Sequence, residues 1–325
     1  MYENESYISF VSRDRSLGPK YDNEIRCSGR TVIVTGANSG LGRETARELA
    51  RRGGKVILAC RDLKSAYKTR DEIIEETYNK NVSVKHIDLS SLDSVAKFAH
   101  DILSTEKRLD VLVNNAGLMH ISKTRQLTAD GFELHLGVNY LGAYLLTQLL
   151  LPKLIQSRPS RVVNLTTVSM NKANIDFADF NLAADYDPYN AYPRSKLALM
   201  SFTQLFNQKY KAQGVTSYAV YPGVATTSLA RGLSQSTISS AVFKPTSLLM
   251  RTPENAIQSV IYCCLEPGIE EKSGQCIKDM KVMKWTSELS NEDSLRLWKI
   301  SQVWTQLDKY RQFCNIPAAQ DHVIK

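Results

Sequence analysis

Long hydrophobic runs are absent from this 325-residue chain, and their absence argues against a membrane-spanning helix. The most apolar stretch, residues 143–154, contains Gln148, Pro152 and Lys153, and it falls well short of the roughly 20 apolar residues that a span requires. The first 29 residues mix acidic and basic side chains without the apolar core of a signal peptide. We therefore expect residues 1–29 to be an unprocessed lead-in, and we expect no transmembrane anchor.

Cysteine and histidine are also sparse. The six cysteines form neither a CxxC pair nor a regular disulfide framework, so we expect reduced thiols and a cytoplasmic location, with peripheral membrane contact as an alternative. The five histidines show no HExxH motif or Cys/His cluster, so no metal site is predicted. The net charge of +8 comes from dispersed basic residues rather than a basic stripe, which favours an anionic cofactor or membrane surface over nucleic acid as a partner.

What remains is the composition of an ordinary globular protein, with 43% apolar and 23% charged residues. Short β-branched runs alternate with longer helical stretches, which predicts an α/β fold with a doubly wound, seven-stranded parallel sheet, the Rossmann fold. The strands are expected at 31–35, 55–60, 82–87, 110–114, 161–166, 216–221 and 275–278. The helices are expected at 41–52, 64–78, 92–104, 132–156, 190–211 and 253–265.

No repeat or low-complexity linker divides the chain, so residues 30–280 are predicted to form one domain. The remaining residues, 281–325, are predicted to form a helical tail that starts near an Asn291 cap and packs on this domain rather than on a membrane or partner. Apolar residues recur there at helical spacing: Leu297, Ile300, Trp304, Leu307 and Tyr310.

A glycine-rich turn, TGANSGLG, lies directly between the first predicted strand and the first helix. In this context backbone N–H groups can approach a pyrophosphate, so the turn predicts a dinucleotide site rather than a plain tight turn. Its spacing, GxxxGxG, differs from the more common GxGxxG. The residues expected to contact the cofactor here are Gly36, Asn38, Ser39, Gly40, Leu41 and Gly42.

The end of the second strand indicates which dinucleotide binds. NAD enzymes usually place a carboxylate there for the ribose, whereas this strand ends in Cys60 and is followed by Arg61 and Asp62. Arg61 can pair with the 2′-phosphate of NADP, and Arg43 could add a second cation. NADP (NADPH) is therefore favoured; in the alternative, Arg61 is in solvent and Asp62 binds the ribose.

Two later strand ends add candidate cofactor ligands. Asp88 follows the third strand, where it could bind the adenine ring or cap the next helix. Asn115, Ala116 and Gly117 follow the fourth strand, where they are expected to stabilise the sheet and line the cofactor cleft.

Tyr192 and Lys196 stand four residues apart, so on a helix they share one face. A nearby ammonium favours the phenolate and would lower the pKa of the phenol from about 10, which would suit it to acid–base work. Because proline is tolerated in a helix's first turn, Pro193 predicts a helix that begins near Asn190 with Tyr192 in that turn.

The motifs TGANSGLG, ILACRD, NNAG, GVNYLG, YPRSK and YPGVATT occur in the order and spacing of the short-chain dehydrogenase/reductase family. From about Gly29 to Trp298 the chain most resembles the branch that contains the retinol dehydrogenases. The resemblance implies that Tyr192 donates or accepts the proton and that Lys196 tunes its pKa and binds the nicotinamide ribose. It also implies that Asn139 holds a water in the proton relay; the alternative is a buried asparagine that only ties helix to strand. Pro222 and Gly223 match the turn beside the nicotinamide, and Thr227 matches the residue at its carboxamide.

The chain departs from the family pattern at the serine that binds the substrate oxygen. Thr167, 25 positions before Tyr192, occupies its place, and Ser169 would substitute only after a two-residue shift of the loop. Threonine keeps the hydroxyl but adds a stiffening methyl group. By the same resemblance, residues 228–251 are the substrate lid, and the apolar N-terminal segment common in membrane-bound members is missing.

Together these features predict an NADP(H)-dependent oxidoreductase for a lipophilic carbonyl or alcohol such as a retinoid. A homo-oligomer is one expected state of association. The alternative is a catalytically weak NADP(H)-binding sensor or interaction protein, in which Thr167 marks the loss of chemistry.

Overall fold

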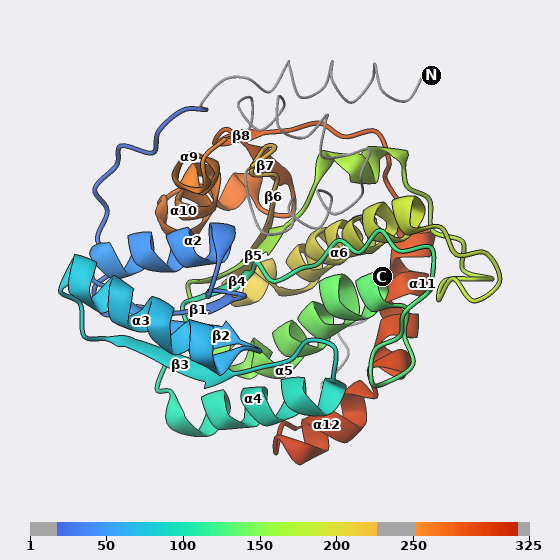
Figure 1. Ribbon diagram of the computed structural model, residues 1–325, viewed down its shortest axis with the longest axis horizontal. Coiled ribbons are helices and arrows are strands. Elements are labelled where there is room, and N and C mark those ends of the chain that lie inside the picture. Colours follow the sequence, from blue (N-terminus) through green and yellow to red (C-terminus); the bar gives the residue numbers. More distant parts are fainter. Residues whose placement is uncertain (1–17, 226–250, 318–325) are drawn as a thin grey trace.

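The computed structural model describes residues 18–225 and 251–317, and these residues build one sheet covered by helices on both faces (Figure 1). The sheet order is β3-β2-β1-β4-β5-β6-β7-β8. The strands are β1 Thr31–Thr35, β2 Lys55–Cys60, β3 Val82–His86, β4 Val111–Asn114, β5 Ser160–Leu165, β6 Val215–Val220, β7 Cys276–Lys278 and β8 Lys281–Val282. The helices are α2 Gly40–Arg51, α3 Leu63–Thr77, α4 Leu92–Thr105, α5 Gly142–Gln156, α6 Pro188–Tyr210, α9 Pro253–Ala256, α10 Gln258–Leu265, α11 Asn291–Trp304 and α12 Leu307–Phe313.

The first seven strands are all parallel, which confirms the predicted doubly wound sheet. The eighth strand is an addition: β8 runs antiparallel to β7, so the predicted tail begins with two residues of the sheet. Asp279 and Met280 make the hairpin turn with φ of 52° and 61°. Such turns normally carry Asn or Asp followed by Gly; Asp279 fits the first position, but Met280 stands where Gly is expected, so the sequence contained no clear sign of a hairpin.

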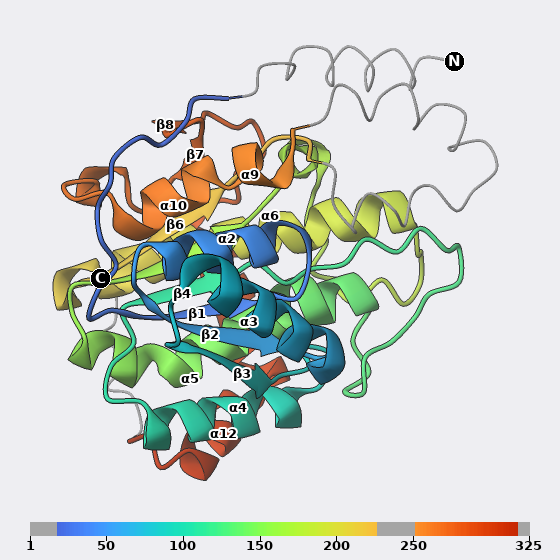
Figure 2. The same cartoon turned by 60° about the vertical axis from the view of Figure 1, so that its left-hand side comes forward.

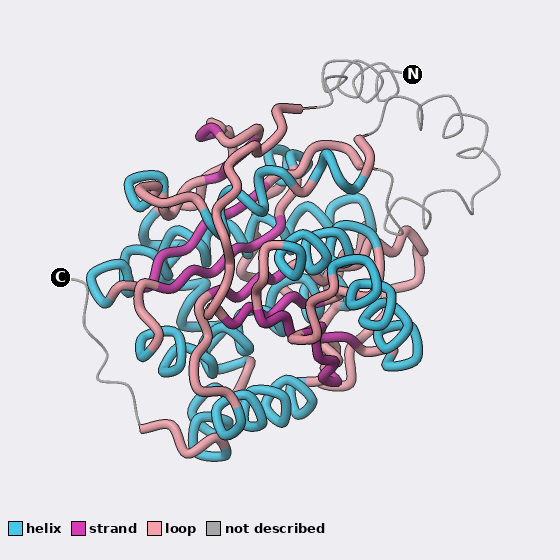
Figure 3. The backbone as a smooth tube through the Cα atoms, turned by 90° about the vertical axis from the view of Figure 1, so that its left-hand side faces the viewer, coloured by secondary structure: helices cyan, strands magenta, loops and turns pink. Residues whose placement is uncertain are grey.

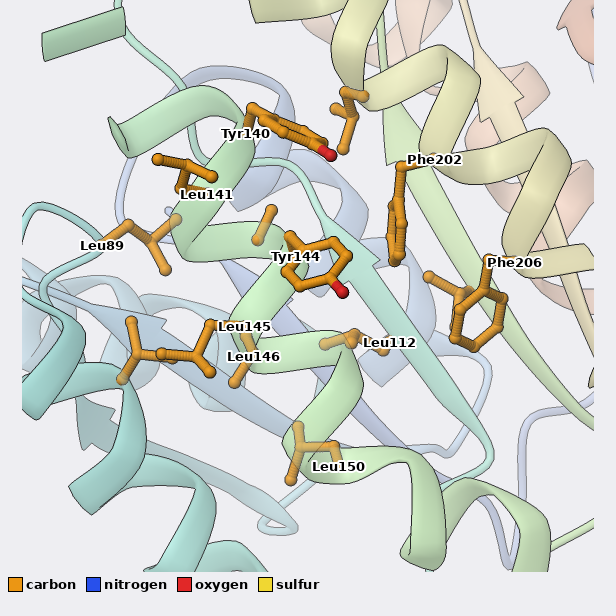
Figure 4. Close-up of a cluster of buried hydrophobic side chains, with 14 of the residues drawn as sticks. Leu89, Leu112, Tyr140, Leu141, Tyr144, Leu145, Leu146, Leu150, Phe202 and Phe206 are labelled. Carbon is orange, nitrogen blue, oxygen red and sulfur yellow. The ribbon is translucent and has the colours of Figure 1, made fainter. Parts of the chain in front are cut away.

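Successive strand residues point into two separate cores, because side chains alternate across a sheet. Ile33 and Ile57 face the core formed with α4, α5 and α6, whereas Val32 and Val34 face the core formed with α2, α3 and α10. Figure 2 shows α2 and α3 in front of the sheet, and Figure 3 shows the strands enclosed by helices. In the close-up of the first core, Tyr144 of α5 lies beside Leu112 and Phe202 (Figure 4).

Three helix predictions need correction. The helix expected at 132–156 is α5 preceded by a π-helical turn, Leu136–Leu141. The helix expected at 253–265 is two helices, α9 and α10, because the chain turns at Ile257. The helix expected to start near Asn190 starts at Pro188 after the cap Asp187, so the prediction that Tyr192 lies in its first turn is wrong and Pro193 lies inside the helix.

The C-terminal segment packs against the domain, as predicted. It forms two helices rather than one, because Gln306 adopts a left-handed conformation with φ of 49°. Its cap is Ser290 and not Asn291, since the Ser290 hydroxyl accepts the Asp293 N–H at 3.0 Å. Across the described ranges, no helix is both long and apolar enough to cross a membrane.

Candidate active site

The glycine turn between β1 and α2 depends on close backbone packing. Gly36 and Gly40 have φ of 64° and 53°, which few other residues adopt. A Cβ on Gly42 would lie 2.3 Å from the Gly36 carbonyl oxygen and 2.4 Å from Asn115 Nδ2. The first turn of α2 carries no acidic side chain, so the partial positive charge of this helix end is not neutralised there. The turn therefore fits an anionic phosphate.

Asn115 stabilises this turn from the end of β4. Its Nδ2 donates to the Thr35 carbonyl oxygen at 2.8 Å, and its backbone N–H and that of Ala116 donate to Thr35 Oγ1 at 3.0 and 2.9 Å. Asn38 Nδ2 donates to Ser65 Oγ at 2.8 Å, which joins the turn to α3. These hydrogen bonds explain why the short glycine-rich turn keeps one conformation between β1 and α2.

The end of β2 presents one cation without a partner. Arg61 is exposed and forms no ion pair or hydrogen bond with any residue that the structure describes. Asp62 caps α3 by accepting the Ser65 N–H at 3.3 Å, and its hydrogen bonds with Ser65 lower its pKa. Arg43 is paired with Glu72 at 2.9 Å. One oxygen of the Asp62 carboxylate is therefore used by the cap, whereas the Arg61 guanidinium has no partner among the described residues; which of the two binds the ribose end of the cofactor stays a prediction.

Cys60 lies at the contact between β2 and the glycine turn. Burial raises the pKa of its thiol to about 11, and hydrogen bonds from the Ala37 and Asn38 backbone partly offset that effect. The thiol is therefore an uncharged contact, and the last residue of β2 places no negative charge beside the turn.

Asp88 is half-buried at the end of β3, and its side chain is used locally. Its Oδ1 accepts the Ser90 N–H at 2.9 Å and the Ser90 hydroxyl at 2.7 Å. The cap of α4 is Ser91, so the alternative in which Asp88 caps that helix is wrong. Its contact with adenine stays a prediction.

Tyr192 lies on α6 with a buried phenol, 7% of the residue being exposed. Burial raises its pKa to about 12, and a hydrogen bond with the Thr167 hydroxyl partly offsets this. The predicted lowering of the pKa by Lys196 is therefore wrong, since burial outweighs other influences. Ser169 lies one hydroxyl further away, its Oγ donating to Thr167 Oγ1 at 3.4 Å. Thr167, not Ser169, is thus the hydroxyl that influences the pKa of Tyr192.

Lys196 approaches the same place from the next turn of α6. Its Nζ donates to the Leu165 carbonyl oxygen at 2.9 Å, and burial lowers its pKa to about 8. A Cβ on Gly117 would lie 3.3 Å from Lys196 Nζ and 3.2 Å from Asn139 Oδ1. The structure therefore brings the end of β5, the segment after β4 and α6 together around Lys196.

Asn139 lies in the π-helical turn and is almost fully buried. Its Oδ1 accepts the Leu118 N–H at 2.8 Å, and its Nδ2 donates to the Leu118 carbonyl oxygen at 3.0 Å and to Ser195 Oγ at 3.1 Å. The amide is the tie between helix and strand end that the sequence allowed as one of two roles.

Comparison with known proteins gives the family. The family model described as short chain dehydrogenase matches residues 30–237. This chain belongs to the short-chain dehydrogenase family. Retinol dehydrogenase 13 of Homo sapiens is 42% identical over 291 residues, 88% of this chain and 87% of that protein. Retinol dehydrogenase 11 of Homo sapiens is 40% identical over 279 residues, 85% of this chain and 86% of that protein.

Solved structures give the same fold. An uncharacterised protein from Mycobacterium paratuberculosis aligns with a TM-score of 0.67 and 29% identity, covering 89% of this chain and 98% of its own. A protein described as an NAD(P)-dependent gluconate 5-dehydrogenase from Beutenbergia cavernae, solved with NADP, aligns with a TM-score of 0.65. Its identity is 24%, over 79% of this chain and 97% of that one, so it bears on the fold alone. Family and relatives make this short-chain dehydrogenase an oxidoreductase acting on CH–OH groups.

Pro222 and Gly223 follow β6 and are buried, with Gly223 at a φ of 83°. Thr227 and nearly all of the predicted lid, residues 228–251, lie outside the described residues. The two flanks of that segment meet, because Ala225 bridges to Arg251 in parallel and the Arg251 N–H donates to the Val224 carbonyl oxygen at 2.8 Å. The residues that flank the segment therefore lie side by side beyond the end of β6.

Sequence reasoning missed three polar residues around the site. Glu133 and His135 form a buried pair beside Tyr192. Ser195 accepts from Asn139 and donates to the Tyr192 carbonyl oxygen at 2.7 Å. The sequence signal that could have revealed the pair was a carboxylate and an imidazole two residues apart, at Glu133 and His135. Both side chains are buried, where an unpaired polar group is costly.

Proposed function

We propose that this short-chain dehydrogenase is an NADP(H)-dependent enzyme that interconverts lipophilic carbonyls and alcohols, with retinoids as the leading substrate class. The observation that carries the proposal is the buried Tyr192 phenol, whose pKa the nearby Thr167 hydroxyl lowers against the effect of burial. The substrate class is supported by about 40% identity to proteins named retinol dehydrogenases. The large apolar side chains within residues 228–251, such as Leu233, Phe243 and Met250, also suit a lipophilic substrate.

The residues around the glycine turn fit a nicotinamide dinucleotide. Gly36 and Gly42 keep the turn close to α2, whose N-terminus suits the pyrophosphate. Arg61 is available for a 2′-phosphate, while Asp62 is engaged as a cap. When bound, the nicotinamide would supply or accept the hydride. Of the other predicted ligands, we retain Asp88 for the adenine, and Pro222, Gly223 and Thr227 for the nicotinamide.

The high pKa of Tyr192 keeps the phenol protonated at neutral pH, so it is ready to give a proton to a carbonyl oxygen. Thr167 would hold the same oxygen through its hydroxyl, which argues for an enzyme over a sensor that has lost its chemistry. Lys196 would hold the ribose and supply positive charge when protonated, and we assign Asn139 to positioning.

The first test is Tyr192→Phe. We expect it to lower kcat for NADPH oxidation with all-trans-retinal by about a hundredfold or more, because it removes the proton donor. NADPH binding, followed by fluorescence, should be unchanged. The matched control is Tyr189→Phe, one α6 turn earlier and 66% exposed, which should retain full turnover. Undiminished turnover in Tyr192→Phe would refute the mechanism, and NADPH binding without turnover of any carbonyl in a panel would favour the sensor.

The second test is Arg61→Ala, which addresses the cofactor. We expect its Kd for NADPH to rise by roughly tenfold to a hundredfold, since a charge-assisted contact to phosphate is removed. The Kd for NADH should stay the same. Arg51→Ala removes an exposed arginine paired with Glu48 at the other end of α2 and serves as the control. Equal losses for both cofactors would exclude Arg61 as the 2′-phosphate ligand.

A further inference from the structure

Glu133 and His135 form a hydrogen-bonded couple inside the protein, with side chains 0% and 1% exposed. His135 Nδ1 lies 2.8 Å from Glu133 Oε1. The carboxylate also accepts the backbone N–H groups of His135 at 3.0 Å and Leu136 at 2.9 Å. Burial by itself would raise the pKa of Glu133, but these hydrogen bonds outweigh it and lower the pKa. The carboxylate is therefore ionised and fully hydrogen-bonded.

The second ring nitrogen determines the tautomer of His135. His135 Nε2 lies 2.9 Å from the backbone nitrogen of His120, whose N–H it accepts. A nitrogen that accepts a hydrogen bond carries no proton, so the proton is on Nδ1 and is donated to Glu133. His135 is thus a neutral ring whose orientation is fixed from both sides.

This ring lies between the site and the segment that borders it. Its centroid is 6.1 Å from that of Tyr192, with the planes at 70°, an edge-to-face contact. The segment from Gly117 to His120 passes Lys196 at Gly117, is held by Asn139 at both backbone groups of Leu118, and is held by His135 at His120.

We infer that His135, oriented by Glu133, is a positioning residue for the reaction: it fixes the segment 117–120 and the face of the Tyr192 ring. This rests on the proposed function. A buried ionic group is weak evidence for stability, because well-packed apolar residues often stabilise a core as well or better. Its place against the reacting phenol explains it better, since small displacements of an acid cost far more in rate than in folding.

The test compares His135→Gln with His135→Asn in the full chain. Glutamine reaches the position of Nε2 and can accept the His120 N–H, whereas asparagine reaches only that of Nδ1 and leaves the His120 N–H without an acceptor. We expect His135→Asn to lower kcat with NADPH and all-trans-retinal by about tenfold or more, with KM and the NADPH Kd changed by less than about threefold. His135→Gln should recover most of the lost kcat.

His100→Gln is the control, because His100 is a partly buried histidine on α4 that contacts Phe313 instead of the site. Melting temperatures identify any variant that does not fold, in which case the other is compared with the wild type alone. Equal kcat values for the Asn and Gln variants, or a wild-type kcat in His135→Asn, would overturn the inference. Absence of turnover in the wild-type protein would instead refute the proposed function.

Discussion

At the scale of single residues, burial decides the charge states around Tyr192. Tyr192 and Lys196 lie on one face of α6, and burial favours the uncharged form of both side chains. It raises the pKa of Tyr192 to about 12 and lowers the pKa of Lys196 to about 8. The sequence placed the two residues one turn apart on a helix, which the structure confirms, while the contact between phenol and ammonium stays a prediction. It could not predict how little water reaches them, because that depends on β5, the segment after β4 and the π-helical turn packing around α6.

The lowered pKa of Lys196 makes the stability depend on pH. Its folded pKa of about 8 lies below the ordinary value of 10.5, so the unfolded chain holds the proton more tightly. Burial of the ammonium therefore lowers the free energy of unfolding by its full amount below pH 8. This loss disappears as the pH rises toward 10.5. We expect the stability of Lys196→Met relative to the wild type to fall by on the order of 2–3 kcal/mol between those limits.

Urea unfolding of both proteins across this pH range measures that difference. Lys68→Met is the control, because the Lys68 side chain is 80% exposed and its substitution should give a difference independent of pH. A constant difference for Lys196→Met would show that the ammonium is not buried at a cost.

At the scale of elements, local signals predicted the regular strands and helices but not their irregular ends. The glycine turn, β1 and α2 follow from hydrophobic periodicity and turn chemistry that lie within a few residues. The π-helical turn Leu136–Leu141 does not, because its residues have the same apolar spacing as a helix. This turn carries Asn139, so the irregular element is one that the site uses.

At the scale of the whole molecule, α11 and α12 complete the core. Trp304 stacks on Phe132 at 5.5 Å and lies 5.4 Å from the Phe180 ring, while Trp298 contacts Tyr144 and Phe202. Phe132 directly precedes Glu133. The C-terminal helices therefore cover elements that position the candidate active site, although they contribute no residue to it in the described structure.

This packing predicts that Trp304→Ala destabilises the whole domain by about 2–4 kcal/mol, since it removes a large, partly buried aromatic side chain. Urea unfolding should show one cooperative transition at a lower midpoint. Val303→Ala, at a residue 74% exposed on the same helix, should leave the midpoint unchanged. If Trp304→Ala unfolds α11 and α12 separately, with an unchanged main transition, the tail is not part of the cooperative unit.

The sequence by itself determined the parallel sheet and the glycine turn, because both follow from periodicity and residue spacing, which are local properties of the chain. The roles of Tyr192, Lys196 and Thr167 came from the resemblance to the short-chain dehydrogenase family. The tertiary structure alone decided that Asp62 caps α3, that Arg43 pairs with Glu72 and that Glu133 and His135 lie against Tyr192. Which polar groups become partners depends on how distant elements pack and how much water they exclude, and no short stretch of sequence specifies that.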